Sequence, residues 1–141
     1  MVLPNEKRKV IPMKEKIKAA ITSLGADLCG IAGIERFKDA PPGFHPCDLY
    51  PDCKSVIVFA KSLPAGVKNV NPRIMYTTVT DQNLKELDRI SYLGALAIEK
   101  IGGKAVPLPS DVPYEYWDAQ RLEGRGILSM RHAALLSGIG S

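Results

Sequence analysis

The sequence predicts an α/β or α+β fold in which helices flank a small mixed sheet in two to three layers. Three segments carry this prediction. An amphipathic pattern over 12–25 indicates a helix on the surface of a core, residues 55–60 form a β-branched and aromatic run typical of a buried strand, and apolar periodicity over 80–101 indicates a long helix. The chain has 141 residues, of which 45% are hydrophobic, so it is long enough for one domain with its own core.

The first helix is expected to begin at Pro12 and to end at Gly25. Its apolar side chains recur on one face, at Ile17, Ala20, Ile21 and Leu24. A short strand follows over 27–34, where Gly30 and Gly33 predict a close approach by another backbone. The proline-rich residues 35–52 are expected to form a long loop.

Residues 55–60 are expected to form an internal strand with both faces covered, followed by a loop over 62–72. Thr80 is then the predicted N-cap of a helix that runs to about Ile101. This helix is apolar on two sides, which predicts burial between layers or against a partner. One stripe holds Leu84, Leu87, Ser91, Gly94, Ala95 and Ile98, and the other holds Ile90, Leu93, Ala97 and Ile101.

A short edge strand is predicted over 104–108, because Pro107 cannot donate a ladder hydrogen bond. Residues 110–126 are read as a loop, and 130–137 as a helix. The Ser129 hydroxyl is expected to cap that helix by accepting a backbone N–H, and Gly138 is expected to close it. Another strand or a ligand-facing loop normally follows such a turn, so we expect the single domain of residues 1–141 to be the truncated front half of a larger one.

The net charge is +4, but the basic surplus gathers near the start of the chain and indicates a solvated tail leading into a helix. A spread basic face is not visible, so nucleic acid such as tRNA is not an expected partner. No stretch approaches the roughly 18 apolar residues of a membrane span, so no membrane association is expected. Three cysteines at irregular spacing fit a reducing, cytoplasmic compartment.

His45, Cys47 and Cys53 are the one grouping with metal-ligand chemistry. Structural zinc sites pair ligands at closer spacing and use four of them, so we expect no metal here, only a loop thiol and a thiol at a strand edge. The chain also lacks the cysteine run that holds an iron–sulfur cluster.

Arg131 and His132 lie in the first turn of the last predicted helix, where they could act as an anion clamp and a proton donor. Tyr114, Tyr116 and Trp117 could stack on a planar ring, or they could cover the edge of the core. The Gly138-Ile-Gly140 turn follows a helix where a dinucleotide fingerprint would follow a strand, which favours a helix cap.

Four segments occur in an order and spacing that match a known family across nearly the whole chain. They are residues 51–59, Tyr76 with Asp81 at the start of a long helix, residues 105–109, and residues 131–140. Together they resemble the N-terminal half of the epoxyqueuosine reductases and the reductive dehalogenase-like corrinoid iron–sulfur proteins. The resemblance implies half of a corrinoid-binding domain with nitroreductase-like topology, which in that family continues into a ferredoxin-like module with two clusters.

The resemblance implies reductive chemistry in which a cobalt corrinoid such as cobalamin, reduced through iron–sulfur clusters, acts on an epoxide or a carbon–halogen bond. It assigns Arg131, with Gly138 and Gly140, to the turn near the corrinoid, and His132 stands beside that arginine. It assigns Tyr76 and Asp81 to a helix-entry segment of the cofactor site. Asp111 is nearest to the carboxylate that serves the family as general acid, displaced by a residue or two.

The chain departs from this family because it has no cluster cysteines, so a partner would have to supply electrons. We therefore expect a truncated or divergent relative, completed by a second copy as a homodimer or by a chain that supplies the missing half. Two alternatives remain. One is a non-catalytic dimeric interaction module, and the other is a small FMN-dependent reductase with a nitroreductase-like fold.

Overall fold

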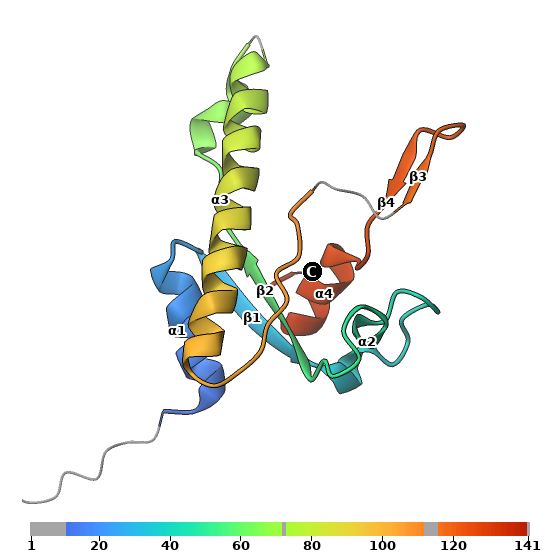
Figure 1. The fold of residues 1–141 in the computed structure, drawn as a ribbon. Helices are drawn as coiled ribbons and strands as arrows, with labels where there is room; N and C mark the ends of the chain where they lie inside the picture. Colours follow the sequence, from blue (N-terminus) through green and yellow to red (C-terminus); the bar gives the residue numbers. More distant parts are fainter. Residues whose placement is uncertain (1–10, 72, 112–115, 141) are drawn as a thin grey trace, which may run out of the picture.

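The computed structural model describes residues 11–71, 73–111 and 116–140 and has an α+β fold, as predicted (Figure 1). Its α-helices are α1 (Met13–Ser23), α2 (Pro46–Leu49), α3 (Ile74–Lys100) and α4 (Met130–Ser137). Short 3-10 helices are η1 (Ile34–Phe37) and η2 (Ala65–Asn69). The strands are β1 (Leu28–Gly33), β2 (Ser55–Ala60), β3 (Tyr116–Asp118) and β4 (Glu123–Arg125).

The central sheet pairs β1 and β2 in antiparallel register, from Leu28 opposite Ala60 to Gly33 opposite Ser55. Successive side chains of a strand point to opposite faces, so each strand contributes to two separate cores. Among the described residues β2 pairs with β1 alone, and its residues after Ser55 are only partly buried. The expectation of an internal strand is therefore wrong for these residues, whereas both faces of β2 are covered and its bounds are as predicted.

One face of the sheet is covered by α1 and α3, which lie side by side (Figure 1). Ile21 of α1 and Ile90 of α3 are 3% and 0% exposed, and they form the core of this layer with Ala26. Gly94 lets the two helices approach, because a side chain there would collide with Ile21. Sheet residues packed on this core are Cys29, Ile57 and Phe59.

The opposite face of the sheet is covered by α4. Ala133 of this helix is 2% exposed and forms a second core with Ala32 and Phe37. Arg36 strengthens the contact because its guanidinium donates to the carbonyl oxygen of Leu136 at 2.8 Å. The described chain thus has three layers, with α1 and α3 on one side of the sheet and α4 on the other.

The helix α3 begins at Ile74 with Arg73 as its N-cap, seven residues before the predicted N-cap at Thr80. The hydroxyl of Thr80 donates to the carbonyl oxygen of Tyr76 at 2.8 Å, so Thr80 is an interior residue of the helix and not its cap. The first turns of α3 extend past the end of the central sheet (Figure 1).

The predicted strand over 104–108 is absent, and this segment runs along α3 without ladder pairing. Side-chain hydrogen bonds, and not strand pairing, fix this segment against α3. Ser91 donates to the carbonyl oxygen of Leu108 at 3.4 Å, and the Ser110 hydroxyl donates to that of Leu84 at 3.2 Å. Prolines at 107 and 109 remove two of the donors that a strand would need.

Residues 110–126, read from the sequence as a loop, contain the β3–β4 hairpin, which stands apart from the central sheet (Figure 1). Its turn is held by Asp118, whose carboxylate accepts from the backbone N–H groups of Gln120 and Arg121 at 2.9 and 3.1 Å. None of the helices in the described ranges is long and apolar enough to cross a bilayer.

Candidate functional site

The end of α4 lies unusually close to the central sheet. A Cβ atom added to Gly30 would lie 2.6 Å from the carbonyl oxygen of Ser137 and 2.9 Å from Cγ2 of Ile139. Only a residue without a side chain permits this approach, which confirms the close backbone contact predicted for Gly30. Gly33 behaves differently, because a side chain there would meet that of Glu35.

The turn after α4 is a helix cap, as its sequence context indicates. Gly138 has a φ of 82°, in the left-handed region that favours glycine. The N–H groups of Ile139 and Gly140 both donate to the carbonyl oxygen of Ala134, at 3.1 and 3.2 Å. A Cβ on Gly140 would lie 3.1 Å from Cβ of Ala134, so this glycine packs back onto its own helix.

The first turn of α4 presents Arg131 and His132 to solvent. Ser129 precedes this turn, but it makes no side-chain bond to the backbone of the helix, so the predicted cap bond is wrong. Its hydroxyl oxygen lies instead 2.7 Å from Nδ1 of His132. The contact holds the imidazole beside the start of the helix, where the dipole favours an anion.

Tyr76 and Asp81 both lie on α3, but they do not share a face. Five residues along an α-helix correspond to a rotation of roughly 140° between the two side chains. Both are exposed. Tyr76 therefore lies in the first turn of α3 and Asp81 lies further along it, and their side chains point in different directions.

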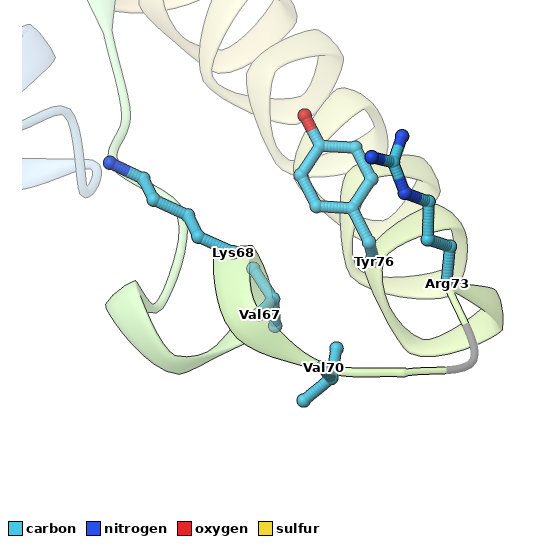
Figure 2. Close-up of a pocket in the computed structure, with 5 residues that line it drawn as sticks. All are labelled: Val67, Lys68, Val70, Arg73 and Tyr76. Carbon is cyan, nitrogen blue, oxygen red and sulfur yellow. The ribbon is translucent and has the colours of Figure 1, made fainter.

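Tyr76 lines a shallow hollow of about 240 Å³ between η2 and the start of α3 (Figure 2). The other lining residues are Val67, Lys68, Val70 and Arg73. Figure 2 shows the amine of Lys68 and the guanidinium of Arg73 on opposite sides of the hollow, so the two cations do not converge on one point. The sequence analysis did not predict this hollow. The basic residues on either side of the loop before α3 could have indicated it.

Asp111 is exposed and follows the segment that runs along α3. Its neighbour Ser110 is fixed, because the N–H of Ser110 donates to the carboxylate of Asp88 at 2.8 Å. Asp111 therefore does not follow a strand, which is where the family resemblance puts the catalytic carboxylate. Of the aromatic cluster, Trp117 is 57% exposed on the hairpin, and Tyr114 lies outside the described residues.

The candidate residues come from elements on opposite sides of the central sheet. Arg131 and His132 lie on α4, while Tyr76 and Asp81 lie on α3, whose second half packs on the other face. The hollow at Tyr76 is smaller than the roughly 300–1,000 Å³ of ordinary ligand pockets, and a corrinoid is a large ligand. These residues, within one chain, do not fit a complete corrinoid site.

Metal ligands do not gather in the described part of the chain, where no three His, Cys, Asp or Glu side chains are arranged to hold an ion. His45 instead accepts the N–H of Cys47 through Nδ1, at 3.1 Å, as part of a cap for α2.

No family model, curated protein or solved structure matches this chain.

Proposed function

We propose that this chain contributes half of a corrinoid site, of the kind used by the epoxyqueuosine reductases, and that a second copy of the chain completes it. The order of the four family-like segments supports the choice of cofactor. The observation that carries the proposal is the first turn of α4, where Arg131 and His132 are both exposed next to helix N–H groups. This turn offers charge and hydrogen-bond donors to a polar ligand, on a surface that the described chain leaves open.

The central sheet supports completion by a second copy. Each of β1 and β2 pairs along one edge within the described residues, so each keeps one edge that can accept a further strand. Unpaired strand edges are templates for association, and addition of strands from another copy would widen the sheet around α4. The added layer could enclose a cofactor that the half site alone leaves exposed.

Electrons would reach such a site from outside residues 1–141. A four-iron cluster needs four thiolate ligands, and the sequence has three cysteines at positions 29, 47 and 53. The oxidoreductase role in this proposal therefore includes an external reductant, and a substrate is left unassigned.

A second candidate function is a non-catalytic dimeric interaction module. The apolar side chains that α3 leaves exposed favour it, because a second copy could bury them. Those more than about one third exposed are Ile74 at 67%, Met75 at 46%, Tyr76 at 42%, Tyr92 at 59% and Leu96 at 40%.

The test is an anaerobic titration of the purified protein with cob(II)alamin, followed by size-exclusion chromatography that records visible absorbance and mass together. Pigment that co-elutes with a dimer supports the proposal. A dimer without pigment favours the interaction module, and a monomer without pigment overturns both. A flavin spectrum in the purified protein would favour the FMN-dependent alternative instead.

Arg131→Ala sharpens this titration. Loss of one charged hydrogen-bond donor should weaken corrinoid binding by about tenfold. Arg121→Ala is the matched control, since Arg121 is an exposed arginine on the hairpin turn. Equal binding by the two variants would remove α4 from the proposed site.

A further inference from the structure

Cys47 lies in α2, and Cys53 lies at the end of the tight turn that leads from α2 toward β2. The N–H of Tyr50 donates to the carbonyl oxygen of Pro46 at 3.0 Å, and the N–H of Cys53 donates to that of Tyr50 at 2.9 Å. These two turns fold the chain back on itself. As a result, Sγ of Cys47 lies 3.7 Å from the carbonyl oxygen of Cys53.

The position of Cys47 is fixed by the cap of α2. Nδ1 of His45 accepts the N–H of Cys47 at 3.1 Å, and the carboxylate of Asp48 accepts the N–H of His45 at 3.0 Å. Pro46 between them is buried. The loop is therefore already ordered in the reduced protein, so closing it by a covalent bond removes little further conformational freedom from the folded state.

Cys53 can turn toward Cys47 because its own contact is weak. Its thiol donates to the carbonyl oxygen of Ser55 at 3.5 Å, and a thiol is a weak hydrogen-bond donor. Both cysteines are half-buried, so a small reagent can reach them. Cys29 is on a different element, on the sheet face that packs against α1 and α3.

We propose that Cys47 and Cys53 form a reversible intramolecular disulfide that ties α2 to the start of β2, while Cys29 stays reduced. The oxidant is a low-molecular-weight disulfide. One cysteine thiolate attacks it, forms a mixed disulfide and releases one thiol. The second cysteine then attacks the mixed disulfide, forms the internal bond and releases the second thiol. The protein loses two electrons and two protons, and the small disulfide gains them.

Tryptic mapping tests this directly, because the sequence places both cysteines in one peptide. Cleavage after Lys38 and Lys54 yields residues 39–54 with Cys47 and Cys53, and cleavage after Lys18 and Arg36 yields residues 19–36 with Cys29. The folded protein is equilibrated with glutathione buffers of increasing oxidised fraction, alkylated and digested. We expect peptide 39–54 to lose two hydrogens and carry no alkyl group, while peptide 19–36 stays alkylated.

Single variants separate an internal bond from simple glutathionylation. Cys47→Ser should leave Cys53 as a stable glutathione adduct, Cys53→Ser should do the same to Cys47, and Cys29→Ser should not change peptide 39–54. The proposal is overturned if both cysteines are alkylated at every buffer ratio. It is equally overturned if the wild-type peptide keeps glutathione, or if the bond is found between two chains on a non-reducing gel.

Discussion

Gly30 fixes how closely α4 approaches the central sheet. Replacement by alanine puts a Cβ atom within 2.6 Å of the carbonyl oxygen of Ser137, so the helix must move away from the sheet. We expect Gly30→Ala to lower the free energy of unfolding by about 1–3 kcal/mol, as overpacking of a core does. Urea denaturation measures this change.

Gly66→Ala is the matched control for this substitution. A Cβ atom on Gly66 would meet no atom within 4 Å, so its unfolding midpoint should stay near that of the wild type. Equal midpoints for the Gly30 and Gly66 variants would contradict the close packing of α4.

Asp27 links the start of β1 to the loop after β2 and makes stability depend on pH. Its carboxylate accepts the N–H and the hydroxyl of Ser62, both at 2.8 Å. The backbone bond, followed by the hydroxyl, holds the pKa of the Asp27 carboxyl below its usual range. A lowered pKa stabilises the fold above the unfolded pKa of about 3.9, and this contribution is lost as the pH falls through the folded pKa.

We therefore expect Asp27→Asn to be less stable than the wild type at pH 7, with a difference that shrinks on acidification below about pH 4. Urea unfolding midpoints of the two proteins, measured at pH 7 and below about pH 4, give this difference in stability. A difference that stays constant with pH would show that the ionised carboxylate is not the stabilising form.

The second half of α3 has a buried face and an exposed face. Ile90 is fully buried against α1, whereas Tyr92 on the same helix is 59% exposed. Ile90→Ala should cost about 2–5 kcal/mol of unfolding free energy because it leaves a cavity between the two helices. Tyr92→Ala should change it by less than about 0.5 kcal/mol in the monomer. Similar losses in chemical denaturation would mean that α3 packs through another face.

The first turns of α3 should open more readily than its second half. Residues 73–78 are all exposed, and Figure 1 shows them past the end of the sheet. Amide exchange followed by mass spectrometry should therefore be faster over 77–82 than over 90–98, because local opening there breaks few apolar contacts. Uniform protection along α3 in a dilute, monomeric sample would contradict this division.

The sequence predicted correctly those elements in which the local conformational preference of the residues agrees with the way the element packs in the fold. The β-branched run at 55–60 became β2 with the predicted bounds, and Gly138 closes α4 as expected. The start of α3 was missed because Thr77, Thr78 and Thr80 are poor helix formers, and threonine is common at N-caps. In the structure their hydroxyls donate to carbonyl oxygens one turn earlier, at 2.8–3.4 Å.

The candidate site was harder to predict than the elements. The residues near one another in sequence, such as Arg131 and His132, do share a turn of α4. The sequence could not show how the residues of α3 and α4 lie relative to one another, because the two helices pack on opposite faces of a two-stranded sheet, which local patterns do not encode. A sequence motif could not show that the candidate residues of α3 and those of α4 are separated by the sheet.

The described residues form a three-layer α+β unit around a two-stranded sheet, and we propose that this unit carries half of a corrinoid site. If a second copy completes the site, corrinoid binding and assembly must be thermodynamically linked. Each should promote the other, and the linkage can be measured without knowing the substrate.

The most direct measurement is the fraction of cob(II)alamin bound, at fixed pigment and rising protein concentration, with the mass of the pigmented species followed by sedimentation velocity. We predict that binding rises more steeply than in proportion to protein and that the pigment sediments with a species heavier than one chain. Binding to a single chain, with the same affinity at every protein concentration, would contradict the half-site account, and so would pigment that stays free throughout.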